Sequence, residues 1–165
     1  MDEVTPTRRA LSIGISHFAE VGDLDWEPLG FASRRAAAIE DMLARFGYTL
    51  AKPQPAEALT GELLADDIWR AVRELGPDDV LVVHLLTHGF VSRTGALYAV
   101  GADGNYHSSG DIGQWLRRLV DIPGAPLTLF LLDLCHAGMA TRMSWQMSVA
   151  DGDNRAWVIA ACGPA

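Results

Sequence analysis

The sequence predicts an α/β fold, a three-layer sandwich with a mostly parallel central sheet and helices on both faces. Two apolar runs, Val80–Leu86 and Leu127–Leu132, have the length and the continuous hydrophobicity of strands that are buried on both faces. Segments with helical periodicity separate these runs, and such alternation is typical of βαβ units with right-handed crossovers. The 165 residues suit one domain, spanning 1–165.

The first half of the chain predicts strand, helix, short strand, helix. Residues 10–15 form the first expected strand, and residues 22–30 a loop at its C-terminal edge. A helix capped by Ser33 is expected to run to Phe46, where Gly47 stops it, with a short strand at 48–51. Thr60 is the predicted cap of the next helix, which Gly76-Pro77 ends and whose apolar stripe is Leu64, Ile68, Ala71 and Leu75.

The second half continues this alternation. After Val80–Leu86, residues 96–100 are expected to form one arm of a hairpin. A third helix is predicted to begin at Ser108 or Ser109, with Ile112, Trp115, Leu116 and Leu119 facing inward. Residues 139–154 lack a sustained period and are expected to form a loop, and residues 156–161 a last strand.

Composition restricts the partners and the compartment. The net charge of −8 argues against nucleic acid or an anionic membrane as the main partner. No apolar run approaches the roughly 18 residues that span a bilayer. Two cysteines, Cys135 and Cys162, do not make a disulfide framework, and residues 1–9 lack the apolar core of a secretion signal. A cytoplasmic protein is therefore expected.

Reactive side chains follow the two longest apolar runs. The first run leads into Thr87-His88-Gly89, and the second into Asp133-Leu134-Cys135-His136-Ala137-Gly138. The carboxyl edge of a parallel sheet is where ligands gather, so the Cys135 thiol and the His88 imidazole are expected to meet there. A neighbouring imidazole can take the proton of a thiol and leave the nucleophilic thiolate.

These two motifs resemble those of the caspase-like cysteine peptidases, in particular the metacaspase-like and bacterial branches. Cys135 follows His88 by 47 residues, close to the spacing of about 50 in caspases. The resemblance implies a cysteine endopeptidase with a His88–Cys135 dyad, an oxyanion hole made by the N–H groups of Gly89 and Cys135, and no cofactor. Domains of this family continue past the last strand. The chain is therefore expected to be the dyad-carrying portion, with the C-terminal part absent and a small subunit or further domains as partners.

Asp133 is the expected determinant of specificity. Side chains alternate along a strand, so Asp133 and Cys135 lean to the same side if the extension persists. An acid there would attract a substrate arginine or lysine, and the metacaspase-like enzymes have an acid at the matching place. A second acid of this substrate pocket is expected from Asp23 or Asp25, in the loop after the first strand. The family often has Asn-Asp where this chain has Ser33-Arg34-Arg35 at the first helix.

Other interpretations stay open at this point. Cys135 could be a buried structural thiol, and Asp133 a carboxylate that binds nearby backbone. His84 and His88 stand about 13 Å apart along a strand, so His84 is interpreted either as a core residue or as a residue that supports the site from behind it, and no metal site is expected. No twelve-residue calcium loop is present. The rival functions are a caspase-like regulatory or assembly module with little activity, and a thiol hydrolase acting on a non-peptide amide.

Overall fold

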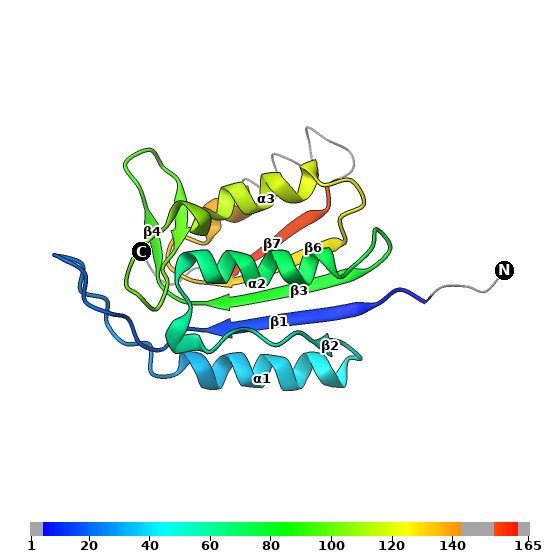
Figure 1. Cartoon of the computed structure of the whole chain (residues 1–165), viewed down its shortest axis with the longest axis horizontal. Coiled ribbons are helices and arrows are strands. Elements are labelled where there is room, and N and C mark those ends of the chain that lie inside the picture. Colours follow the sequence, from blue (N-terminus) through cyan, green and yellow to red (C-terminus); the bar gives the residue numbers. More distant parts are fainter. Residues whose placement is uncertain (1–4, 143–153, 162–165) are drawn as a thin grey trace.

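A computed structural model describes residues 5–142 and 154–161, and within them the predicted parallel sheet is confirmed. Its five strands lie in the order β2-β1-β3-β6-β7, and every neighbouring pair is parallel (Figure 1). Their bounds are β1 Arg8–Gly14, β2 Thr49–Leu50, β3 Val80–Leu86, β6 Leu127–Asp133 and β7 Ala156–Ala161. A separate antiparallel hairpin joins β4 (Gly89–Val91) to β5 (Leu97–Ala99), directly after β3.

Among the described residues, the α-helices of ten residues or more lie against the sheet: α1 Ala32–Arg45, α2 Gly61–Arg73 and α3 Ile112–Asp121. The predicted cap of α2 is confirmed, because Thr60 Oγ1 accepts a hydrogen bond from the N–H of Leu63 at 3.3 Å. The predicted start of α3 is wrong. Ser108 and Ser109 lie in a separate 3₁₀ turn, and the carboxylate of Asp111 caps α3 instead.

The predicted cap of α1 at Ser33 is also wrong, because α1 begins at Ala32 and has no side-chain cap. The hydroxyl of Ser33 lies 2.8 Å from the hydroxyl of Ser16, in the segment that follows β1. This tertiary contact takes the oxygen that a helix cap would have used. The short strand predicted at 48–51 is confirmed for Thr49–Leu50.

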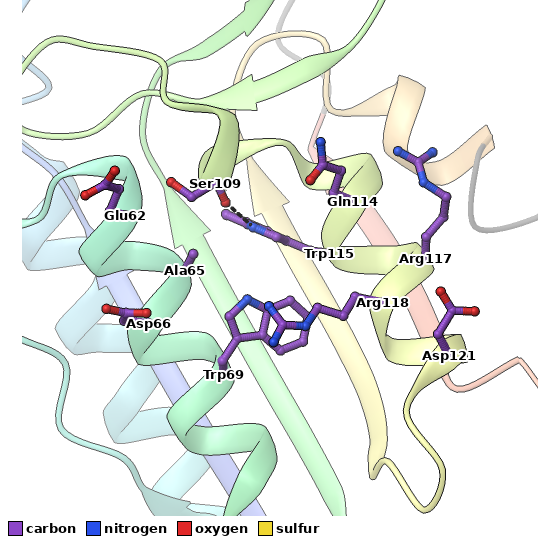
Figure 2. A pocket seen from close by; sticks show the side chains of 10 residues that line it. All are labelled: Glu62, Ala65, Asp66, Trp69, Ser109, Gln114, Trp115, Arg117, Arg118 and Asp121. Carbon is purple, nitrogen blue, oxygen red and sulfur yellow. Dashed lines mark hydrogen bonds between the residues drawn. The ribbon is translucent and has the colours of Figure 1, made fainter.

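Helices α2 and α3 lie side by side on one face of the sheet and leave a hollow of about 560 Å³ between them (Figure 2). The guanidinium of Arg118 in α3 stacks over the ring of Trp69 in α2, 4.4 Å from its centroid. This stack lies along the hollow and joins the two helices.

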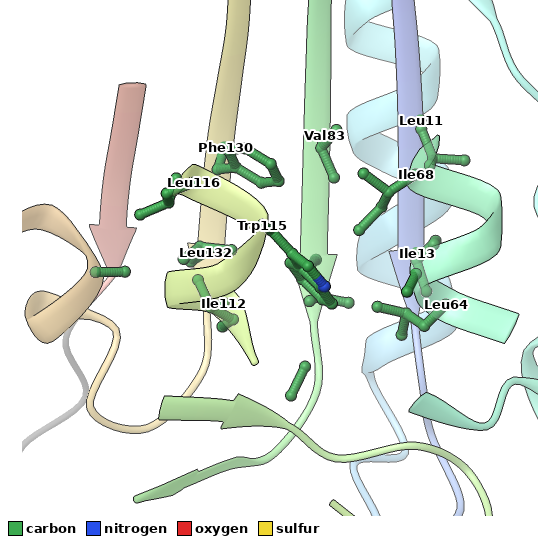
Figure 3. Packing of buried hydrophobic residues seen from close by; sticks show 14 of the residues in the cluster. Leu11, Ile13, Leu64, Ile68, Val83, Ile112, Trp115, Leu116, Phe130 and Leu132 are labelled. Carbon is green, nitrogen blue, oxygen red and sulfur yellow. The ribbon is translucent and has the colours of Figure 1, made fainter. Parts of the chain in front are cut away.

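The main hydrophobic core lies between these two helices and the sheet (Figure 3). Trp115 of α3 packs on Phe130 of β6, with ring centroids 6.5 Å apart. All four residues predicted to face inward from the third helix are buried: Ile112, Trp115, Leu116 and Leu119. Alternate strand residues complete this core, among them Leu11, Ile13, Val83 and Leu132.

The opposite face of the sheet is covered by α1 over β1 and β3, where Leu43 packs against Ala10 and Val82. These two helical layers and the sheet confirm the predicted three-layer sandwich. Farther along this face, over β6 and β7, apolar side chains are exposed. We call them the exposed sheet strip: Leu127, Trp157 and Ile159, with exposures of 41%, 48% and 59%.

The segment after Asp133 differs from the loop predicted at 139–154. Residues 138–142 are helical, and residues 143–153 lie outside the described part of the chain. Among the residues that the structure describes, no helix is both long enough and apolar enough to cross a membrane.

Candidate active site

The carboxyl ends of β3 and β6 lie next to each other and carry His88 and Cys135. Leu86 pairs with Asp133 at the end of the two strands, and each reactive residue follows two positions later. The turn at Cys135 touches Gly89, because a Cβ built on Gly89 would overlap the carbonyl oxygen of Cys135. Only glycine permits so close a backbone approach. The two predicted motifs are therefore neighbours in the fold.

The imidazole of His88 is held by a backbone carbonyl. Its Nε2 lies 2.8 Å from the carbonyl oxygen of Glu27, in the segment between β1 and α1. A carbonyl oxygen can only accept, so Nε2 carries the hydrogen and donates it to Glu27. In the neutral ring, Nδ1 is then the nitrogen with the free lone pair, and it can accept a proton.

Two aromatic side chains from the same segment flank this imidazole. The ring of Trp26 stacks on His88 with centroids 5.1 Å apart and planes 30° apart, and the ring of Phe18 lies at 4.8 Å with a tilt of 53°. None of these contacts was predicted from the sequence. Glu27 acts through its backbone, which carries no residue signature, and the two aromatic residues have no motif spacing to His88.

Cys135 lies in the turn that follows β6, and its side chain is exposed. The alternative of a buried structural thiol is therefore wrong. The next residue, His136, has a φ of 65°, in the left-handed region that non-glycine residues seldom adopt. The turn closes through the N–H of Ala137, which donates to Leu134 at 3.3 Å, and helical residues follow from 138. Such uncommon backbone conformations cluster at functional sites.

The N–H of Gly89 points away from its hairpin partner. The N–H of Val100 donates to the carbonyl of His88 at 3.0 Å, so Gly89 and Ala99 form a non-hydrogen-bonded pair of the antiparallel ladder. In such a pair the N–H groups are directed outward. The turn of Cys135 lies against Gly89, so the predicted pair of oxyanion donors belongs to two backbone segments in contact.

Asp133 ends β6 on the sheet face that α1 covers, and it is partly buried. Among the residues that the structure describes, its carboxylate has no hydrogen-bond or ion-pair partner. This disagrees with the alternative in which Asp133 serves as a structural carboxylate bound to backbone. A partly buried carboxylate without a protein partner is available to a cationic ligand.

His84 lies on the same face and belongs to a buried hydrogen-bonded chain. Ser12 Oγ donates to the carbonyl of Ala36 at 2.9 Å, so Nδ1 of His84 must donate to Ser12 Oγ at 2.8 Å. Burial lowers the pKa of His84, and the negative charge of Asp133 opposes this shift. His84 is thus a hydrogen-bonded core histidine, as predicted.

Asp23 and Asp25 are both exposed. Asp23 lies at the tip of a tight turn that the bridge between Val21 and Leu24 closes. Within the described part of the chain, neither carboxylate makes a hydrogen bond or an ion pair. Their proposed place in the substrate pocket stays a prediction. Among the described residues, no group of three or more His, Cys, Asp or Glu side chains could hold a metal ion.

The sequence was compared with family models and with curated proteins. A family model described as the caspase domain matches residues 7–158. This span contains both strand ends, the Cys135 turn and helices α1, α2 and α3. No curated protein matches the chain.

Proposed function

The chain belongs to the caspase-domain family of cysteine peptidases, and from this premise we propose that it hydrolyses peptide bonds after arginine or lysine with a Cys135–His88 dyad. The observation that carries this proposal is the contact between the turn of Cys135 and the backbone that follows His88. An exposed thiol and an oriented imidazole at adjoining strand ends are the two groups that the chemistry requires.

The first chemical step uses the orientation of His88. Nδ1 removes the proton of the Cys135 thiol, and the thiolate sulfur attacks the scissile carbonyl carbon. The π electrons of that carbonyl move to its oxygen, where the N–H groups of Gly89 and Cys135 stabilise the negative charge. The carbonyl of Glu27 keeps the ring in place and stabilises the imidazolium through Nε2–H.

Two further steps release the products, first the amine and then the carboxylic acid. The carbon–nitrogen bond breaks, the imidazolium gives its Nδ1 proton to the leaving amine, and an acyl thioester remains on Cys135. Water then attacks the thioester, His88 takes a proton from that water, the thiolate of Cys135 leaves, and the imidazolium returns the proton to this thiolate. A free carboxylic acid and the resting enzyme result, so protons and bonds balance over the cycle.

The proposed preference for basic residues rests on Asp133. Its carboxylate lies two residues before the nucleophile and lacks a protein partner in the described part of the chain. A guanidinium or ammonium group of the substrate would satisfy it with a charge-assisted hydrogen bond. An aspartate side chain of a substrate would instead meet a like charge at this position.

The second candidate function is a regulatory or assembly module with little intrinsic activity, and the exposed sheet strip favours it. In the described part of the chain β7 is the last strand on this side of the sheet, and apolar side chains exposed together on the face beside it are typical of a surface that another polypeptide covers. We propose that a C-terminal small subunit or further domains of the same protein bind there. Binding of this kind is compatible with a peptidase whose substrate groove the partner completes.

A peptide panel separates these functions. We would assay the chain on fluorogenic peptides that carry Arg, Lys or Asp before the cleaved bond, with Cys135→Ala as the control. Turnover of the Arg and Lys peptides, abolished in Cys135→Ala, is expected. Faster turnover of the Asp peptide would contradict the role of Asp133. No turnover of any peptide by a folded chain would favour the assembly module.

A further inference from the structure

Trp26 contacts the candidate base on one side and a distant loop on the other. Its ring stacks on His88, and its Nε1–H donates to the carbonyl of Gly104 at 2.9 Å. Gly104 lies 78 residues farther along the chain, in the loop between β5 and α3. The indole therefore links the segment that covers His88 to the loop between β5 and α3.

The backbone around Gly104 lies in close contact with the segment that carries Trp26. Gly104 has a φ of 71°, and a Cβ at this position would overlap the carbonyl oxygen of Ala19. The N–H of Ala19 in turn donates to the carbonyl of Ala102 at 2.8 Å. Two hydrogen bonds and one close backbone approach thus tie the Phe18–Glu27 segment to the 101–107 loop.

Polar side chains within the 101–107 loop form hydrogen bonds with one another. Asp103 Oδ2 lies 2.6 Å from Nε2 of His107, and the Nδ2 group of Asn105 lies 3.4 Å from the same carboxylate oxygen. The N–H of Ala102 donates to Leu59, just before α2, at 2.7 Å. The acceptor that Trp26 uses therefore belongs to a loop fixed to the scaffold.

From these contacts we propose that Trp26 is the positioning residue of His88, which it holds through the ring stack and through the anchor at Gly104. This inference rests on the proposed function of the His88–Cys135 pair. The next residue is Glu27, whose carbonyl accepts from Nε2, so the indole anchor also fixes that carbonyl. An aromatic face beside the ring further stabilises the imidazolium.

Loss of the anchor is expected to act on the chemical step. A displacement of about 1 Å of a catalytic group can cost on the order of 100-fold in rate. Trp26→Leu removes both the stack and the N–H donor, and we expect a decrease in kcat of about 10-fold or more with little change in KM. Trp26→Phe keeps an aromatic face but loses the bond to Gly104, so its kcat should lie between those of Trp26→Leu and the wild type.

The experiment has two readouts that do not depend on a peptide substrate. The first is the rate at which iodoacetamide alkylates Cys135 between pH 5 and 9, followed by peptide mass spectrometry. The second is the tautomer of His88, measured by ¹⁵N NMR of the imidazole. Trp69→Leu is the matched control, because Trp69 contacts Arg118 on the face of the sheet that carries α2 and α3. Thermal unfolding of each variant shows whether it is folded.

In the wild type we expect one tautomer with hydrogen on Nε2, and in Trp26→Leu a mixture together with slower alkylation of Cys135. Trp69→Leu should keep the wild-type tautomer and alkylation rate even if it unfolds at a lower temperature. A Trp26→Leu protein with the wild-type tautomer and alkylation rate would overturn the positioning role while leaving the peptidase proposal intact. If the tautomer changes in Trp26→Leu but the wild type cleaves no peptide, the positioning role stands and the proposed peptidase function fails.

Discussion

Adding one methyl group at Gly89 should separate the two backbones that form the candidate site. In Gly89→Ala the new Cβ would overlap the carbonyl oxygen of Cys135 and lie 2.6 Å from Cδ1 of Leu134. Ordinary carbon contacts begin near 3.5 Å, so β4 and the Cys135 turn must move apart by about 1 Å. The obstacle is backbone rather than the end of a flexible side chain, so it cannot be relieved by a change of rotamer.

Two effects follow from this displacement, one on stability and one on activity. Overpacking of a close contact typically costs about 1–3 kcal/mol of the free energy of unfolding. A shift of about 1 Å between nucleophile and oxyanion donors costs on the order of 100-fold in kcat/KM. A 100-fold loss corresponds to about 2.7 kcal/mol, so the two free energies are comparable. A variant that stays folded in the assay should nevertheless lose most of its activity.

The assay compares Gly89→Ala with Gly30→Ala, for which no atom lies within 4 Å of the added Cβ. We would measure kcat/KM on the best peptide of the panel, the alkylation rate of Cys135 and the midpoint of thermal unfolding. Gly30→Ala should match the wild type in all three. A Gly89→Ala protein that keeps kcat/KM within twofold of the wild type would refute the idea that this backbone contact builds the site.

Three further predictions concern charge, pH and a helix cap. Asp133→Asn should lower kcat/KM for Arg peptides by roughly 10- to 100-fold, the equivalent of one hydrogen bond to a charged group, and an unchanged ratio of Arg to Asp peptide cleavage would exclude this role. Burial lowers the pKa of His84 below 6.5, so the unfolded chain binds its proton more readily than the folded chain does. The free energy of unfolding should therefore be unaffected above pH 6.5 and fall as the pH drops through that value toward the lower folded pKa. Urea titrations should show this loss reduced in His84→Asn and kept in the exposed control His17→Asn, and equal slopes in the two variants would contradict it. Thr60→Ala should cost about 1 kcal/mol of unfolding free energy because α2 loses its side-chain cap, and a loss below the error of a urea titration would mean that solvent replaces the hydroxyl.

The sequence predicted most accurately the features that depend on one local pattern of apolar residues. Val80–Leu86 is apolar apart from His84 and contains three valines, and a run of this length between turn signals is typical of a strand that is buried on both faces. The inward face of α3 likewise follows from helical spacing, because its apolar positions have no other place to bury. Patterns of this kind belong to consecutive residues and need no knowledge of distant partners.

Helix starts were less predictable because several oxygens compete for the same N–H groups. Ser33, Ser108 and Ser109 are all suitable cap residues by type. The hydroxyl of Ser33 bonds to Ser16, and Asp111 lies nearer to the first turn of α3 than either serine. The outcome depends on which partners the tertiary structure brings within reach.

The layers, the parallel sheet and the edge of that sheet at which Cys135 and His88 emerge could all be predicted from the sequence, because burial periodicity and the alternation of strands and helices along the chain depend on local residue type. The contacts that hold His88 could not be predicted in this way. The carbonyl of Glu27 carries no residue signature, and the stack of Trp26 depends on a loop 78 residues away that closes against it. Long-range closure of this kind is a property of the folded chain, since it depends on how separate segments pack rather than on any spacing along the sequence.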